Sequence, residues 1–190
     1  MRRLALGLLC LVLASSAHAG MGRCGDVGGR SVPCDCGDVL VGSRTLGDDD
    51  PITGRVCPGT GLVVSLPAGT TATLALGGRV LAGSGRGFGI QVLAGGDGVT
   101  IVGPGGVRGF EIGILAAAGG LARVADVTVA ENRTDGVSVV GTGYAVSGCE
   151  ALRNGRDGFA LRGRGYRADG NRALENGRHG FVGTGRDAAI

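Results

Sequence analysis

The chain has 190 residues, of which 42 are Gly and 5 are Pro, and a formal net charge of +3. Every cationic side chain apart from His is Arg, because the sequence contains no Lys. This much Gly would indicate a disordered chain if it were not periodic. However, short β-branched segments such as 99–102 and 124–129 lie between turn residues, as strands do, and exclude disorder.

The first 19 residues predict a secretory signal peptide. They begin with Met1-Arg2-Arg3, continue through an apolar stretch at 4–14 and end at Ala17-His18-Ala19, a small-residue cleavage site. The apolar stretch is too short for a membrane-spanning helix, which needs roughly 20 residues. We therefore expect cleavage near Ala19, a secreted or periplasmic product and no transmembrane segment. Without the leader the acidic and basic residues nearly balance, and we expect no nucleic-acid partner.

Four cysteines fall within residues 20–60, which we interpret as an N-terminal cap: Cys24, Cys34, Cys36 and Cys57. In an exported protein two disulfides are favoured over a zinc site. Three pairings are possible and the sequence does not decide among them. Cys34 and Cys36 are poorly placed to pair with each other, which favours Cys24 with Cys34 and Cys36 with Cys57. Of the two other cysteines, Cys10 lies in the predicted leader and Cys149 is expected to be a buried, inert thiol.

Three asparagines, Asn132, Asn154 and Asn176, are spaced 22 residues apart, and each is followed four residues later by a glycine and an apolar residue. A unit this short cannot enclose a core alone and must stack on copies of itself, which is typical of a solenoid. Stacked amides can donate to one turn and accept from the next. We therefore expect the asparagines to form a buried ladder.

A glycine register extends the repeat toward the N-terminus with spacings of 22 to 24 residues: Gly89, Gly113, Gly136, Gly158 and Gly180. Apolar residues one and three positions after each glycine predict a strand with those side chains facing inward. A second inward-facing strand is predicted between residues 124 and 129 and in its two repeats. The predicted fold is all-β, a parallel β-helix in residues 61–190 with about five full coils and an incomplete last one.

Several segments resemble the right-handed parallel β-helix repeat proteins of the pectin-lyase-like superfamily, particularly exported bacterial ones. The similarity runs from about Cys36 to Phe181, through Cys36-Gly-Asp38, residues 56–64, 73–78 and 99–114, and the later Asn-x-x-x-Gly units. This resemblance implies a right-handed β-helix. It implies little about activity, because the superfamily includes lyases, hydrolases, epimerases, adhesins and scaffolds.

One column of residues has the composition of a catalytic site. Asp135, Asp157 and His179 precede successive repeat glycines, and Arg156 and Arg178 stand one position earlier in two of the units. Two carboxylates about 5 Å apart suit a retaining glycosidase, and Asp, Asp and His could also hold a divalent metal. The favoured interpretation is simpler: Asp is common at turns, these turns look open, and the arginines balance the charge. No metal site is predicted.

Arginines concentrate near the C-terminus, where residues 151–190 carry eight of them against four acids. A stripe of guanidinium groups could bind an acidic polysaccharide. In addition to Arg156 and Arg178, the candidates for this stripe are Arg153, Arg162, Arg164, Arg167 and Arg172. The alternative is that they only keep a Gly-rich surface soluble. Calcium is possible at Asp48, Asp49 and Asp50 but unsupported, since adjacent carboxylates point in different directions and suggest a solvated loop.

The sequence therefore favours an exported, non-catalytic repeat module that presents a stacked surface to a carbohydrate or another protein. A second hypothesis is a lyase, hydrolase or epimerase acting on an acidic polysaccharide, and a third is a truncated remnant without its own activity. Because no cap is recognisable after Gly180, self-association through the last coil is a further expectation.

Overall fold

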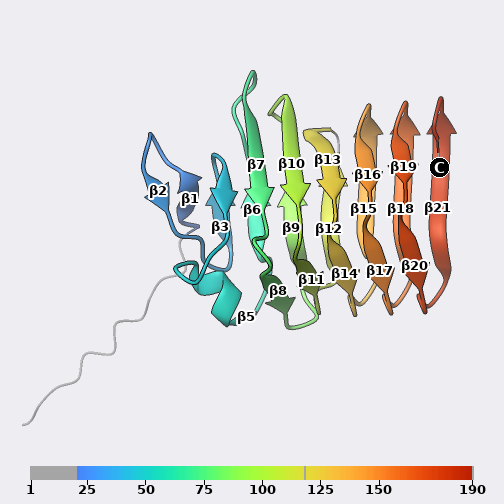
Figure 1. The fold of residues 1–190 in the computed structure, drawn as a ribbon, viewed down its shortest axis with the longest axis horizontal. Helices are drawn as coiled ribbons and strands as arrows, with labels where there is room; N and C mark the ends of the chain where they lie inside the picture. The colour runs from blue at the N-terminus through green and yellow to red at the C-terminus, as the bar shows by residue number, and fades with distance from the viewer. Residues whose placement is uncertain (1–20, 118, 190) are drawn as a thin grey trace, which may run out of the picture.

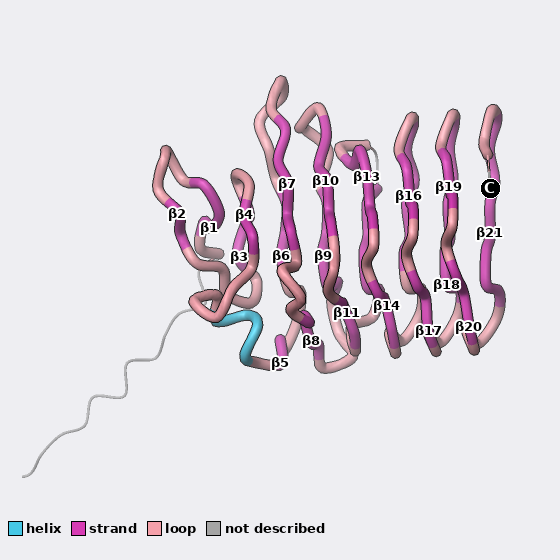
Figure 2. Tube along the Cα trace, viewed as in Figure 1, coloured by secondary structure: helices cyan, strands magenta, loops and turns pink. Residues whose placement is uncertain are grey.

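The computed structural model describes residues 21–117 and 119–189, so the predicted leader lies outside the described residues. These residues wind into an all-β solenoid of about seven turns, whose rungs succeed one another from β1 to β21 in Figure 1. Figure 2 shows a single helical segment among the strands and loops, the 3-10 turn η1 (Pro51–Gly54). None of the described residues forms a helix long and apolar enough to cross a bilayer.

Nine strands form the first sheet, here called the long sheet. Its order is β2-β1-β3-β6-β9-β12-β15-β18-β21, and every pair is parallel except β1 with β2. The strands are β1 (Arg23–Asp26), β2 (Ser31–Val32), β3 (Asp38–Leu40), β6 (Leu62–Val64), β9 (Phe88–Val92), β12 (Ile112–Ala117), β15 (Val137–Thr142), β18 (Asp157–Arg164) and β21 (His179–Arg186).

Two further parallel sheets of six strands complete the turns. The second sheet contains β4 (Arg44–Thr45), β7 (Thr71–Ala75), β10 (Gly98–Val102), β13 (Leu121–Ala125), β16 (Ala145–Ser147) and β19 (Arg167–Asp169). The third sheet contains β5 (Val56–Cys57), β8 (Val80–Gly83), β11 (Gly106–Arg108), β14 (Thr128–Ala130), β17 (Glu150–Leu152) and β20 (Arg172–Leu174). One strand of each sheet makes a full turn.

The core consists of columns of like residues, as the glycine register predicts. Ile90, Ile114, Val137, Phe159 and Phe181 lie in register on five successive strands of the long sheet. The first four are fully buried, and the rings of Phe159 and Phe181 stack with centroids 4.8 Å apart. Side chains of the same shape thus pack directly over one another along the axis.

The prediction of a single second strand across residues 124–129 is wrong. The chain bends at Asp126, whose φ of 56° lies in the left-handed region, and Gly148 and Gly170 repeat that conformation in the next two turns. The bend divides the segment between the second and third sheets, β13 from β14. Glycine adopts this conformation without strain, and Asp is among the few other residues that tolerate it.

The asparagine ladder forms at the corner between the third sheet and the long sheet. The Nδ2 group of Asn132 donates to Oδ1 of Asn154 at 2.9 Å, and Nδ2 of Asn154 donates to Oδ1 of Asn176 at 3.0 Å. Each Oδ1 also accepts the backbone N–H of the residue one turn before it. Phe110 occupies the equivalent position one turn before Asn132 and ends the ladder with a buried ring.

The N-terminal region contains the two disulfides that the sequence favours, Cys24–Cys34 and Cys36–Cys57. The antiparallel hairpin of β1 and β2 covers the first edge of the long sheet, as a cap would. Within residues 20–60, however, β3, β4 and β5 already pair in parallel with β6, β7 and β8. Solenoid turns therefore begin before the first register glycine, which is why there are more than the predicted five.

Candidate functional site

The structure brings Asp135, Asp157 and His179 together at the entry to three successive strands of the long sheet. Asp157 and His179 are in register, and Nδ1 of His179 lies 2.9 Å from Oδ1 of Asp157. The backbone N–H of Asp157 donates to Oδ1 of Asp135 at 3.3 Å. The three side chains thus form a stacked column, like the neighbouring asparagines.

Two arginines lie beside this column. Nε of Arg156 is 3.9 Å from Oδ1 of Asp135, and its Nη2 is 4.0 Å from Oδ2 of Asp157. Arg178 stacks one turn beyond, and its backbone N–H donates to the carbonyl of Arg156 at 2.8 Å. Both arginines are exposed, so they shield the carboxylates from outside the column.

The expectation that these turns are open is wrong for the carboxylates. Asp135 is only 7% exposed and Asp157 only 2%. A retaining glycosidase needs both carboxyl groups to face the sugar ring, whereas here Asp135 accepts a backbone hydrogen bond from the next turn. The burial favours a structural role for the pair, and His179, with half of its side chain exposed, is the accessible member.

The acidic loop at residues 48–50 is held by arginines. Asp50 is buried and accepts hydrogen bonds from Nε and Nη2 of Arg44 and from the backbone N–H of Cys34. These bonds to Asp50 are the main reason that the pKa of Arg44 is raised. Asp49 pairs with Arg44 and Asp48 with Arg79, both at 2.6 Å. Our interpretation of a solvated loop is therefore wrong for Asp50.

Within residues 21–117 and 119–189, no group of three or more His, Cys, Asp or Glu side chains is arranged to hold a metal ion. Cys149 is buried next to the bend at Gly148, and this burial raises the pKa of its thiol. A thiol that is both buried and protonated is a poor nucleophile.

The predicted arginine stripe is divided among the faces of the solenoid. Arg153 pairs with Glu131 at 3.2 Å, and Arg172 pairs with Glu150 at 3.5 Å. Arg167 belongs to β19 in the second sheet. Arg162 and Arg164 belong to β18 of the long sheet, where both are exposed while the neighbouring Leu161 faces the core. The five candidates do not form one surface.

Sequence reasoning left out Arg186, although the 22-residue period that separates it from Arg164 would have identified it. Arg164 and Arg186 are in register on β18 and β21. In the described part of the chain, none of the ion pairs involves Arg162, Arg164 or Arg186. We call these three residues the arginine cluster.

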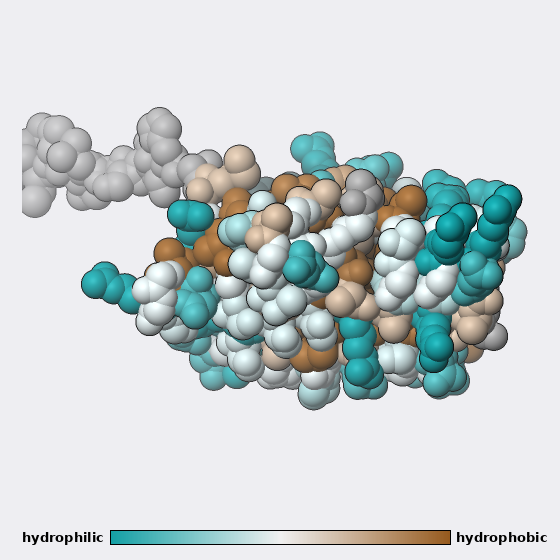
Figure 3. All heavy atoms as spheres, turned by 90° about the horizontal axis from the view of Figure 1, so that it is seen from above, coloured by the Kyte–Doolittle hydropathy of each residue, from teal (hydrophilic) through white to brown (hydrophobic). Residues whose placement is uncertain are grey.

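The surface around the arginine cluster has no carboxylate on the outward positions of the last three strands of the long sheet. Those positions hold only apolar, hydroxyl and Arg side chains: Ser138, Val140, Thr142, Ala160, Arg162, Arg164, Val182, Thr184 and Arg186. Ser138 and Ala160 are buried, so the other seven form the accessible surface. Seen from above in Figure 3, the C-terminal end of the solenoid carries many hydrophilic side chains, while apolar and neutral ones are more frequent toward the middle.

A glycine column keeps this surface flat. Gly141, Gly163 and Gly185 are in register, and a Cβ atom at Gly163 would lie 1.7 Å from the carbonyl oxygen of Gly141. The same distance would separate a Cβ at Gly185 from the oxygen of Gly163. Only glycine lets the turns stack this closely, and Arg164 and Arg186, one position after the column, stand about one strand spacing, 4.8 Å, apart along the axis.

In comparisons with protein-family models, curated proteins and solved structures, nothing matches this chain.

Proposed function

We propose that this protein is an exported, non-catalytic β-solenoid module that binds an acidic polysaccharide through the arginine cluster. Guanidinium groups form paired hydrogen bonds with carboxylates and sulfate-like anions, and a flat array of them matches a polymer with regularly repeated negative charges. The observation that carries the proposal is the set of three exposed arginines without an ion-pair partner, on strands whose outward positions hold no carboxylate.

The charge pattern of the other faces supports this choice. On the third sheet, Arg172 lies opposite Glu150, and both Arg108 and Arg153 approach Glu131. A surface that serves only solubility is expected to have charges of both signs interspersed in this way. Among the described residues, Arg30, Arg86 and Arg123 lack an ion pair too, but the arginine cluster differs because its three arginines lie on two adjacent strands, where they can contact one ligand together.

Export and family are part of the same proposal. The leader-like residues 1–19 and the two disulfides are consistent with an oxidising compartment outside the cytosol. Parallel crossover connections are right-handed in the great majority of proteins, so we infer a right-handed winding. With the sequence motifs quoted above, this supports a distant relationship to the pectin-lyase-like β-helix repeat proteins.

The test is binding to immobilised alginate or heparin by the natural chain and by two triple variants. The first variant carries Arg162→Gln, Arg164→Gln and Arg186→Gln. Exposed pairs of this kind contribute about 0.5 kcal/mol each, so we expect affinity to fall by about tenfold and elution to move to lower salt. Flow-through of the natural chain at low salt would refute the proposal.

The matched control removes three arginines elsewhere. Arg30→Gln, Arg86→Gln and Arg123→Gln change the net charge equally, and all three residues are exposed outside the cluster. We expect the control to elute close to the natural chain. If the two triple variants lost equal affinity for the immobilised polysaccharide, net charge rather than the arrangement of the cluster would cause the retention.

One observation favours a second candidate, an enzyme acting on the same kind of polymer. The contact between Asp157 and His179 is the arrangement in which a carboxylate orients an imidazole as a general base. The ring, half of whose side chain is exposed, would act through Nε2, with Arg156 and Arg178 binding the substrate's carboxylates. An assay for new reducing ends or unsaturated uronates, with His179→Gln as the inactive variant, tests it. Absence of activity in the natural chain would remove this candidate.

A further inference from the structure

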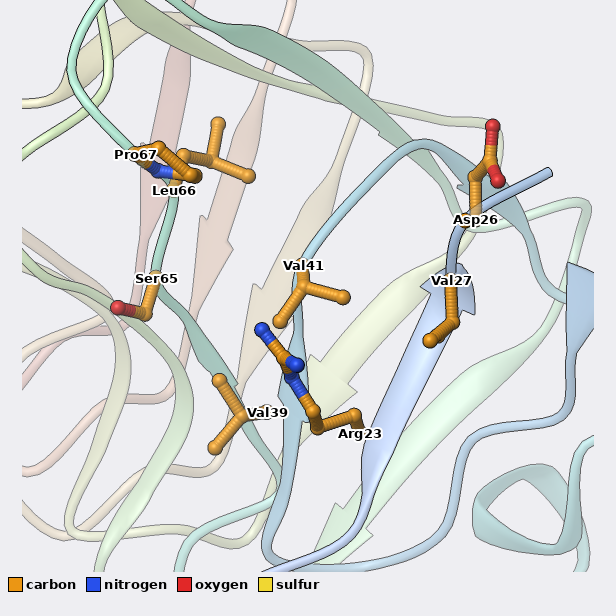
Figure 4. A pocket seen from close by; sticks show the side chains of 9 residues that line it. Arg23, Asp26, Val27, Val39, Val41, Ser65, Leu66 and Pro67 are labelled. Carbon is orange, nitrogen blue, oxygen red and sulfur yellow. The ribbon is translucent and has the colours of Figure 1, made fainter. Parts of the chain in front are cut away.

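A hollow lies on the outer face of the long sheet at its N-terminal end. It has a volume of about 520 Å³ and is lined by Arg23, Asp26, Val27, Val39, Val41 and the segment 65–67, with Gly28 at its rim. Figure 4 shows the Arg23 side chain between Val39 and Val41, with Val27 and Asp26 on one side and Leu66 and Pro67 on the other. The volume is that of a small-ligand pocket.

The guanidinium group of Arg23 has no ion-pair partner in this hollow, although the lining also contains one carboxylate, that of Asp26. Arg23 is exposed, and among the described residues no carboxylate is within 4.0 Å of its guanidinium group. The one acid in the lining, Asp26, uses Oδ1 to accept the backbone N–H of Gly29 at 2.8 Å. The other lining side chains are apolar except for the hydroxyl of Ser65. Such a site fits a ligand that has one anionic group and a ring face of C–H groups able to pack against the valines, as a hydroxylated uronic acid ring does.

The hollow and the arginine cluster lie on the same sheet face. Arg23 pairs with Val39 on β3, and β1 is separated from β18 by six strand steps, about 29 Å. Between Val41 and Arg162, the outward positions on the intervening turns are Ser65, Leu93, Ala117 and Val140, of which Leu93 and Val140 are well exposed. None of these four side chains is anionic, and the one carboxylate at the hollow itself is that of Asp26.

We propose that the Arg23 hollow is a second subsite for the same acidic polysaccharide, so that one chain bridges the hollow and the arginine cluster along the solenoid axis. This inference rests on the proposed function. Two linked contacts increase the apparent affinity through effective concentration, provided that the ligand is long enough to reach both. Ligands shorter than about 29 Å occupy only one subsite at a time.

The test compares short and long alginate oligosaccharides, with extended lengths below and well above 29 Å, by titration calorimetry at ~0.1 M salt. At that ionic strength the Debye length is about 10 Å, and a charge change at Arg23 cannot reach the cluster through space. The variant is Arg23→Gln. Its control is Arg30→Gln, an exposed arginine in the turn between β1 and β2 that does not line the hollow.

We expect Arg23→Gln to lower the affinity for the long oligosaccharide by about tenfold and to change the affinity for the short one less than twofold. The control should match the natural chain for both lengths. If Arg23→Gln and Arg30→Gln bind the long ligand equally well, the second subsite is refuted while the arginine cluster stands. If the natural chain binds neither length, the proposed function fails and the subsite with it.

Discussion

Replacing Asn154 by Ala tests the asparagine ladder at its middle position, where the side-chain amide bonds to both neighbouring asparagines. The Oδ1 atom of Asn154 accepts two hydrogen bonds from Asn132, from the backbone N–H at 3.1 Å and from Nδ2 at 2.9 Å. Its Nδ2 donates to the carbonyl of Val129 and to Oδ1 of Asn176. Both asparagines of the first pair are buried, so water cannot replace the lost partner.

The expected cost follows from the groups left unpaired. Two donors of Asn132 lose their acceptor, and each buried unsatisfied group costs about 1–3 kcal/mol. We therefore expect the free energy of unfolding to fall by about 4 kcal/mol. Asn176→Ala is the matched comparison, because Asn176 lies on the last described turn and is only partly buried. There, water can substitute and the loss should be about 1–2 kcal/mol.

Urea denaturation followed by far-UV circular dichroism gives the two free energies. Because solenoids can open locally, hydrogen exchange of the Asn132 amide measures the same effect at its source. Protection of that amide should fall strongly in Asn154→Ala. The reasoning would be refuted if Asn154→Ala stayed within about 1 kcal/mol of the natural chain, or if the two variants were equally destabilised.

Three further predictions concern the core, the glycine column and the free thiol. Phe159→Ala should lower the free energy of unfolding by about 3–5 kcal/mol in a urea titration. Phe181→Ala should lower it by clearly less, because Phe181 is 38% exposed. Equal losses of stability in the two variants would contradict the stacked column. Gly163→Ala should cost about 3 kcal/mol or more, since its Cβ would overlap the preceding turn. Gly165→Ala is the control, because its Cβ would lie in open space and only the left-handed φ disfavours Ala. We expect it to lower the free energy of unfolding by about 1 kcal/mol. A larger loss of stability in Gly165→Ala than in Gly163→Ala would refute the close stacking. Cys149 should resist iodoacetamide at pH 8 in the folded chain and react once urea unfolds it, because burial raises its pKa; rapid labelling of the folded chain, seen by mass spectrometry, would contradict this.

The repeat made the last four turns predictable. The constant spacing of Asn132, Asn154 and Asn176 sets the register of the surrounding strands, and the inward column through Val137 and Phe159 follows from it. The Cys24–Cys34 and Cys36–Cys57 pairings were favoured for a local reason, the proximity of Cys34 to Cys36, and both form.

The first turns could not be counted in the same way. Leu62 and Ile90 are in register although 28 residues separate them, because the turns between the sheets are longer there. No periodic asparagine indicates those turns, since Phe110 takes the equivalent place just before the ladder. The bend at Asp126 was missed for another reason: an apolar alternation reads the same whether a strand continues or is interrupted by one left-handed residue.

The candidate site, too, was predictable from the sequence only in part. Period alone places Asp157 beside His179 and Arg164 beside Arg186. It does not indicate burial, which depends on how the flanking turns fold over each side chain, and Asp157 is buried as a result. Nor does a count of arginines show which sheet they occupy. The hollow at Arg23 depends on how the hairpin of β1 and β2 sits against the segment 65–67, which no local pattern encodes.

Arginine footprinting tests the central claim most directly, because the chain has no Lys and all its side-chain cations other than His can be followed by one reagent. The protein is modified with a dicarbonyl such as phenylglyoxal, with and without alginate, and the extent of modification is read for each arginine by mass spectrometry. We predict that alginate protects Arg162, Arg164 and Arg186 and leaves Arg30, Arg86 and Arg123 unchanged. Protection spread evenly over all six, or absent from the cluster, would contradict the claim that this face of the solenoid binds an acidic polysaccharide.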